Sequence, residues 1–389
     1  MALLAAIKGR GAAKDHNPYA EEHDAESLVT LNLYGIGNNK YGRLATNDSL
    51  SKYEWKQSYT VADAPVRFTD LACGAGHALA LTAEGALYTW GKCHFGQLGF
   101  GEEDQDRWLP SRLVTADVAA IGAGDSFSFY VDRDGHVYSF GCGYYGPLGL
   151  GTEKTCVTPT RISFFDAIPI RQVTGGAFHS LFLAQDGRAF ACGRNHCGQL
   201  GLGSDTTKNV SVPVLVDIGD RRAIAVAAGL SCSVVLTEAG DCYWFGAKNE
   251  QGAQARKPER LPLPGPVRKA CCSNTSIVAL LEDGSVWQFR EGLDKDLCIP
   301  ARIIDIVAGE MHFIARDERG TLWSWGFSAY QGKLGFGVNA TVTPDPTPMS
   351  VTVPLNIFHM AAGSNHSFCL VNSPDGPTGD GGQTMPLTK

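Results

Sequence analysis

The sequence lacks the patterns that mark several common kinds of protein. Its 389 residues include twelve cysteines, but no two of them are spaced as C-x-x-C, so no structural zinc site is expected. No run of about eighteen apolar residues is present, so no membrane-spanning helix is expected. The G-x-S-x-G turn that presents a nucleophilic serine is also missing. We therefore expect the cysteines to be buried free thiols in a reducing compartment.

Positive charge is scarce as well. The 33 basic residues stand against 40 acidic ones and give a formal net charge of −7, whereas domains that hold nucleic acid usually carry a basic excess. Nucleic acid is therefore not expected as a partner. The densest basic stretch is QARKPER, which contains Arg256, Lys257 and Arg260. It is either a solvated loop or a charge-driven site for a protein partner.

Glycine is abundant, with 46 residues, and much of it recurs at regular intervals. Segments such as LYTWG, in which aromatic residues lead into a glycine, return along the whole chain. They end at Gly35, Gly91, Gly141, Gly193, Gly246, Arg290 (where the glycine is replaced) and Gly326. A feature that returns every few tens of residues is typical of a repeat array or a propeller.

A second series of residues precedes these corners. His77, His179, His312 and His366 each lie ahead of an alternating apolar run that predicts a strand, and Asp125, Cys232 and Thr275 are expected at the same place in the other units. Turns such as TAEG and DRDG then predict tight hairpins. Since other residue types take this place in three units, we expect the histidines to bond the backbone of neighbouring units, and no shared metal site.

The glycine-rich segment GKCHFGQLGFG, which begins at Gly91, follows the corner. Related segments begin at Gly141, Gly193 and Gly326. A phosphate-binding loop needs such glycines before a helix, but here the acidic stretch EEDQDRW follows and the loop is repeated. The pattern indicates a structural turn, so no cofactor is expected.

These three series, recurring in phase without helical periodicity, predict an all-β fold: a seven-bladed β-propeller. The last unit ends in HSFCLV without a following corner strand, while the first corner strand has no unit before it. An N-terminal strand should therefore complete the last blade. The expected organisation is an N-terminal extension (1–26), the propeller (27–372) and a C-terminal tail (373–389).

The in-phase combination of GQLGxG, GxxH and acid-glycine turns resembles the regulator of chromosome condensation repeat family over nearly the whole chain. The resemblance implies a seven-bladed propeller, whose founding member is a guanine-nucleotide exchange factor for the small GTPase Ran. It also implies acidic residues one or two places before the repeat histidines; only Glu310 fits, with Asp125 displaced by one. Segments 102–120 and 152–172 are short for a projecting wedge. Light sensing, as in a plant relative, is not expected, because most tryptophans belong to the corner strands.

The sequence therefore favours a non-catalytic scaffold for protein partners, as a subunit or accessory factor of a larger complex. The alternative is an exchange factor for a small Ran-like GTPase. The repeat is broken after Gly246 and Arg290 and expanded after Gly35, by drift or for a partner. An intracellular location, cytoplasmic or nuclear, is expected, and the basic, acid-free start leaves a mitochondrial one open. The candidate partner surface comprises Tyr53, Trp55, Trp108, Arg256, Lys257, Arg260 and Glu310, with aromatic residues as anchors.

Overall fold

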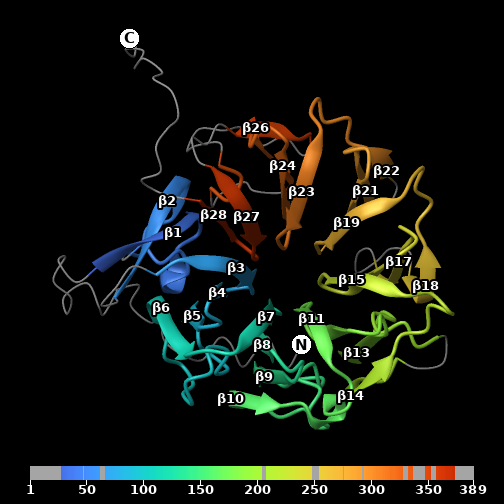
Figure 1. The fold of residues 1–389 in the computed structure, drawn as a ribbon, viewed down its shortest axis with the longest axis horizontal. Helices are drawn as coiled ribbons and strands as arrows, with labels where there is room; N and C mark the ends of the chain where they lie inside the picture. Colours follow the sequence, from blue (N-terminus) through green and yellow to red (C-terminus); the bar gives the residue numbers. More distant parts are fainter. Residues whose placement is uncertain are drawn as a thin grey trace, which may run out of the picture.

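Seven four-stranded antiparallel sheets stand around a central axis as the blades of a ring (Figure 1). They are seen in a computed structural model that describes residues 28–46, 48–61, 66–203, 207–247, 254–274, 276–290, 293–326, 332–335, 347–351 and 356–372. The predicted all-β, seven-bladed propeller is confirmed. The helical elements of the described residues are two short 3-10 turns, η2 (Lys40–Gly42) and η3 (Ser163–Phe165).

The blades are numbered along the chain. In each of the first three, the chain runs from the innermost strand to the outermost strand without a crossover. Blade one contains β3 (Phe68–Cys73), β4 (His77–Thr82), β5 (Leu87–Gly91) and β6 (Arg107–Val114). Blade two contains β7 (Val118–Ala123), β8 (Phe127–Asp132), β9 (Val137–Gly141) and β10 (Cys156–Arg161). Blade three contains β11 (Ile170–Gly175), β12 (His179–Ala184), β13 (Ala189–Gly193) and β14 (Val210–Leu215).

The next three blades repeat this order. Blade four contains β15 (Ala223–Ala228), β16 (Cys232–Thr237), β17 (Cys242–Ala247) and β18 (Gln254–Arg260). Blade five contains β19 (Val267–Cys272), β20 (Ile277–Leu281), β21 (Val286–Arg290) and β22 (Leu293–Asp296). Blade six contains β23 (Ile303–Ala308), β24 (His312–Asp317), β25 (Leu322–Gly326) and β26 (Met349–Val351).

Blade seven combines strands from the two ends of the chain. It contains β27 (Ile357–Ala362), β28 (His366–Val371), β1 (Leu28–Gly37) and β2 (Lys52–Val61), in the order β2-β1-β28-β27. The N-terminal contribution is thus two strands rather than one. Gly37 pairs with His366 as Gly91 pairs with His77, so the first corner is Gly37. The sequence analysis placed it at Gly35, which instead pairs with Phe368.

The strand that begins with the repeat histidine is second from the axis, not innermost. A preceding strand, such as β3 in blade one, lies closest to the axis in every blade (Figure 1). In blades one, three and four only the first and fourth residues of this innermost strand are buried, whereas every residue of the second strand is buried. The innermost strands therefore line the axis, and the histidine strands form the core of each blade.

The hairpins and the packing between blades follow from the repeat. The predicted acid-glycine turn joins the second and third strands, and its glycine has a positive φ, 88° at Gly85, that a side chain would strain. Aromatic rings then fill the space between neighbouring blades: Phe129 and Phe182 meet edge to face at 5.6 Å, and Trp90 meets Phe368 at 5.6 Å. Trp90 and Trp325 are fully buried, as expected for corner-strand tryptophans.

Candidate functional site

The repeat histidines join neighbouring blades. The Nε2 atoms of His77, His179 and His312 lie 2.8, 2.9 and 2.7 Å from the hydroxyls of Ser128, Ser233 and Ser367 on the next blade. The contact is to the neighbouring blade, as expected; its closest partner is a serine hydroxyl, and the backbone of Phe127 and of Cys232 also contributes for His77 and His179. The Ser128 hydroxyl donates to the Gln97 carbonyl, so Nε2 of His77 must carry the proton in this bond.

Burial makes these histidines poor acids and bases. It lowers the pKa of His77 to about 3 and that of His179 to about 4, and it lowers the pKa of His312 and His366 well below the ordinary range. All four imidazoles are fully buried. They are neutral at physiological pH. His77, His179 and His312 bond the next blade, whereas neither ring nitrogen of His366 has a hydrogen-bond partner among the described residues.

The structure corrects the register of this series in two blades. Phe127, not Asp125, pairs with the corner Gly141 as His77 pairs with Gly91. In blade five the equivalent residue is Ser276, because the following residue, Ile277, pairs with Phe289. The predicted residue, Thr275, lies outside the described residues. The error in blade two arose because IGAGD contains two glycines. The motif begins at the second one, Gly124, which is followed three residues later by the core residue Phe127. Cys232 is placed as predicted.

The corrected register gives Asp125 and Glu310 equivalent positions. Each directly follows the glycine that ends an innermost strand, and both line a pocket of about 70 Å³ on the propeller axis. We call this the axial pocket; the ends of all seven innermost strands surround it. Glu310 accepts a 2.8 Å hydrogen bond from Asn274. Within the described part of the chain the Asp125 carboxyl has no hydrogen bond or ion pair, and burial together with the charge of Glu310 raises its pKa to about 7.

Two buried cations lie beside the same opening. Arg43 and Lys333 occupy the loop position that Gln97 holds in blade one, and they are only 7% and 5% exposed. Arg43 donates to the carbonyls of Lys40 and Ala75, and Lys333 donates to the carbonyl of Ser364. Neither forms an ion pair with another described residue. Burial lowers the pKa of Arg43 to about 10 and also lowers that of Lys333.

Aromatic side chains gather on loops of the face that carries the axial pocket. We call Tyr41, Phe95, Tyr144, Tyr145 and Phe178 the aromatic band. Phe95 meets Tyr144 at 5.9 Å and Tyr145 meets Phe178 at 5.2 Å. Tyr41 is approached by Lys40, Arg43 and Lys92, and Tyr145 by Arg194. Tyr144 is 48% exposed. The sequence analysis missed the band, although an aromatic residue precedes the loop glycine in several repeats.

The structure does not gather the predicted partner residues on one surface. Trp108 was expected to be an exposed anchor, but it is 6% exposed because it packs directly beneath Gly42, where a β-carbon would lie 2.5 Å from it. Trp55 on β2 is partly buried against the core of blades six and seven, and Tyr53 on the same strand is also partly buried. Glu310 is in the axial pocket.

The predicted basic stretch forms the outermost strand of blade four. Lys257 and Arg260 are exposed there, Arg256 is half-buried, and Arg260 forms a 2.7 Å ion pair with Asp241. This strand, β18, is at the rim of the ring (Figure 1), whereas Glu310 lines the axial pocket. The basic stretch and Glu310 are therefore separate features.

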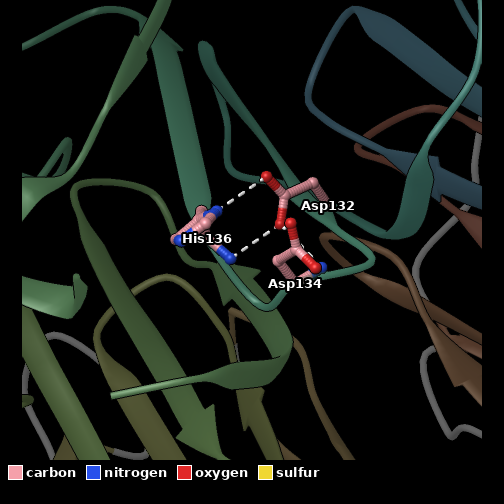
Figure 2. Close-up of side chains that lie close together, drawn as sticks. All are labelled: Asp132, Asp134 and His136. Atoms are coloured by element: carbon pink, nitrogen blue, oxygen red, sulfur yellow. Dashed lines mark hydrogen bonds and ion pairs between the residues drawn. The ribbon is translucent and has the colours of Figure 1, made fainter. Parts of the chain in front are cut away.

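One cluster of possible metal ligands, Asp132, Asp134 and His136, lies in the turn after β8 (Figure 2). Oδ1 of Asp132 accepts from the main-chain N–H groups of Asp134 and His136 at 3.0 and 2.9 Å, and Oδ2 lies 3.0 Å from Nδ1 of His136. Asp317 accepts the same two main-chain bonds in blade six. The geometry is thus explained by hairpin closure, and the turn is at the end of β8 opposite to the axial pocket.

Two further expectations concerned the cysteines, which should be buried free thiols, and membrane-spanning helices, of which none was expected. All twelve cysteines are free; most are buried, but Cys298 is exposed, contrary to the expectation that all would be buried. Burial raises the pKa of Cys242 and Cys271 to about 12, so these thiols are poor nucleophiles. No helix in the described ranges is long and apolar enough to cross a membrane.

The family follows from sequence comparison. The RCC1-like domain family matches residues 25–253, and the regulator of chromosome condensation (RCC1) repeat matches residues 319–370. The first match covers more than half of the chain. This seven-bladed propeller therefore belongs to the RCC1-like domain family, as the repeat motifs indicated.

The chain is similar to several larger proteins. Human E3 ubiquitin-protein ligase HERC2 is 32% identical over 256 residues, which are 62% of this chain and 5% of HERC2. Ultraviolet-B receptor UVR8 of Arabidopsis thaliana is 28% identical over 302 residues, 70% of this chain and 67% of the receptor. The RCC2 homolog of Danio rerio is 30% identical over 246 residues, 55% of this chain and 49% of that protein. The chain thus spans a small part of HERC2 and about half of the RCC2 homolog.

Solved structures share the fold. Human WBSCR16 superposes with a TM-score of 0.76 at 22% identity, covering 88% of this chain and 99% of that one. Yeast RCC1 (Prp20), in a complex with Kap60, has a TM-score of 0.74 at 20% identity and covers 94% of this chain and 95% of that one. At these identities the likeness concerns the fold alone.

Proposed function

We propose that this chain is a non-catalytic, protein-binding propeller, a subunit or accessory factor of a larger assembly, and that it binds its partner with the face that carries the axial pocket and the aromatic band. One observation carries the proposal: Asp125, which is partly accessible, lines the axial pocket, Arg43 and Lys333 are buried beside it, and none of the three forms an ion pair with another described residue. The charge of Glu310 acts on Lys333 and that of Asp106 on Arg43 without direct contact. Charges taken from water without a direct ion pair destabilise a fold, so their concentration at one place favours a functional site.

The aromatic band makes this face suitable for a protein. Rigid aromatic side chains with nearby cations are the groups that dominate binding energy at protein interfaces. Tyr41 and Tyr145 hold φ values of 67° and 73°, a conformation that non-glycine residues rarely adopt. The equivalent position of blade three, before Gly198, holds Cys197, so the loop does not require an aromatic side chain there, which supports a role in binding.

The proposal is tested by affinity purification with mass spectrometry from cells that contain the chain. A partner recovered with the wild type should be lost or strongly reduced with Asp125→Ala and with Tyr144→Ala. Glu318→Gln, an exposed substitution in a hairpin turn of the opposite face, should retain it. Equal recovery with all three variants would contradict the proposed face.

Nucleotide exchange on a small GTPase is the second candidate function. The corrected register favours it, because Asp125 and Glu310 now both stand two places before the repeat-histidine position, where the family resemblance implies acidic residues. Yeast Prp20, which has this fold, has been described with its binding properties to Gsp1p and histones. Against exchange, segments 102–120 and 152–172 form β6, β7, β10, η3 and the start of β11, with no projecting hairpin.

A nucleotide-release assay on a panel of small GTPases separates the two functions. The scaffold proposal predicts no acceleration of release. Acceleration that disappears in the double variant Asp125→Asn, Glu310→Gln would establish exchange instead and contradict a non-catalytic role.

A further inference from the structure

Two kinds of hydrogen bond hold the glycine-rich loops in several blades, although not in all of them, because blade three has Ala191 where blade one has Thr89. A hydroxyl of the same blade donates to the carbonyl of the loop leucine: Thr89 to Leu98 and Ser139 to Leu148, both at 2.8 Å. A group of the next blade donates to the carbonyl just before that leucine. These second bonds are Ser128 to Gln97 at 2.7 Å, Ser180 to Pro147 at 2.8 Å, Ser233 to Gln199 at 2.7 Å and Trp90 Nε1 to Arg43 at 2.9 Å.

Blade five lacks the glycine-rich loop, but the positions that bind this loop in blades one and seven are present there. β21 pairs with β22 up to Arg290 and Leu293, so only Glu291 and Gly292 separate the two strands in the sequence. Gln288 stands where Thr89 stands in blade one, and Trp325 of blade six stands where Trp90 stands, one residue before the corner glycine. We call Gln288 and Trp325 the vacant loop seat.

Both residues of the vacant loop seat have a buried polar atom without a partner. Gln288 is 3% exposed; its Nε2 donates to the Ser276 hydroxyl at 2.9 Å, and its Oε1 has no hydrogen bond. Trp325 is 1% exposed, and its Nε1 has no hydrogen bond. Buried polar atoms without partners are rare in folded proteins. Here one is a donor and the other an acceptor, at the two positions that hold a loop in other blades.

We propose that the vacant loop seat binds a loop of a partner protein, in which a glycine turn precedes an apolar side chain. The partner's main-chain carbonyl accepts the indole N–H of Trp325, and one of its N–H groups donates to Oε1 of Gln288. This inference rests on the proposed function, because the seat lies on the same face as the axial pocket: the loops follow the corner glycines, which pair with the residues beside that pocket.

The chemistry of the seat selects a peptide over other ligands. A phosphate monoester dianion or a carboxylate only accepts hydrogen bonds and cannot satisfy Oε1 of Gln288, and a metal cation cannot accept the indole proton. A peptide group offers a donor and an acceptor together. The apolar residue follows from the chain's own loops, in which Leu44, Leu98, Leu148 and Leu200 are completely buried.

The test uses the full chain labelled with ¹⁵N at its indole nitrogens, and a synthetic peptide with the chain's own loop sequence from Gly91 to Gly101 as the probe. The indole resonance of Trp325, assigned with Trp325→Phe, should move in a saturable way as the peptide is added. The resonance of Trp90 is the internal control, because that indole already bonds the Arg43 carbonyl, and it should not move. Gln288→Leu should weaken peptide binding about tenfold, the loss of one hydrogen bond. A Trp325 resonance that stays in place at the highest soluble peptide concentration overturns the proposal.

A loop graft gives a second measurement that does not depend on peptide affinity. Replacing Glu291 and Gly292 with the sequence from Lys92 to Asp106 should shift the Trp325 resonance without any peptide and abolish peptide binding. A folded graft in which Trp325 keeps its wild-type shift contradicts the inference. Binding of the peptide to the seat, with no partner lost from Asp125→Ala or Tyr144→Ala in affinity purification, would contradict the proposed function alone. Loss of a partner from those variants without peptide binding would contradict the vacant loop seat alone.

Discussion

Blade one and blade five use the same repeat positions in different ways. In blade one, Thr89 anchors the blade's own loop, and the glycine at position 74 leaves room for the buried His77. In blade five the loop is gone, Gln288 turns to the neighbouring Ser276, and serine replaces both the glycine and the histidine. All three features of blade one are therefore replaced together in blade five, whereas blade two keeps the glycine, Gly124, and the loop although Phe127 replaces the histidine.

The largest expected effect comes from adding a single methyl group in blade one. In Gly74→Ala the new β-carbon would lie 2.2 Å from Cε1 of His77 and 2.5 Å from the carbonyl oxygen of Gly124. Because backbone cannot move away cheaply, we expect a loss of about 3 kcal/mol in unfolding free energy. Ser273→Ala at the equivalent position of blade five should cost about 1 kcal/mol, the loss of its bonds to Ser276. Urea denaturation of both variants measures the difference, and equal losses would break the comparison.

The two carboxylates of the axial pocket allow a similar contrast between blades two and six. The pKa of Asp125 is raised from 3.8 to about 7, so the native state holds a proton that the unfolded chain releases. Wild-type stability should therefore fall as pH rises from about 4 to 7 and stay low above it. Asp125→Asn removes this loss. The whole pKa difference would correspond to about 4 kcal/mol, but the residue is partly accessible, so we expect the variant to be more stable than wild type by about 2 kcal/mol at pH 8 and nearly equal to it at pH 4.

Glu310→Gln is the matched control for this pH series. Glu310→Gln weakens the hydrogen bond from Asn274 but also removes the charge that helps to raise the pKa of Asp125. It should therefore bring a smaller gain at pH 8 than Asp125→Asn. Denaturant titrations between pH 4 and 8 measure both variants. A stability difference for Asp125→Asn that does not change with pH would contradict the burial of its carboxyl.

Two tryptophans at equivalent positions allow the contribution of one hydrogen bond to stability to be measured. Trp90→Phe and Trp325→Phe remove the same volume from buried sites, but only Trp90 Nε1 has an acceptor, the Arg43 carbonyl. We expect Trp90→Phe to destabilise the fold by about 1–2 kcal/mol more than Trp325→Phe. Thermal unfolding of the pair gives the answer, and equal effects would mean that the bond from Trp90 contributes nothing.

The smallest expected effect concerns the histidine contact between blades. His179→Phe imitates Phe127 of blade two and removes the bond to Ser233, which should cost about 1 kcal/mol at pH 7. The pKa of His179 is lowered to about 4, so its contribution is present above about pH 6.5 and is lost as pH falls towards 4. The difference between wild type and variant should shrink over that range. A difference that grows on acidification would contradict a neutral, buried His179.

The fold could be predicted because its three motifs recur in phase, and a ring is the arrangement that joins an incomplete last unit to an incomplete first one. The site could not. Asp125 was misplaced because a short motif with two glycines fits two registers, and only strand pairing decides between them. Trp108 was read as exposed because the residue that covers it, Gly42, belongs to another blade and is distant in sequence. The approach of Asp125 to Glu310 depends on the correct register of blade two and on the ring, which brings blades two and six to one axis.

The proposed binding face can be tested most directly by photocrosslinking in cells that contain the chain. Benzoylphenylalanine placed at Tyr144, which is 48% exposed in the aromatic band, should crosslink to a protein partner. The same group placed at Asp134, in the exposed hairpin turn of the opposite face (Figure 2), should not. Crosslinks from position 134 with none from position 144 would contradict the account.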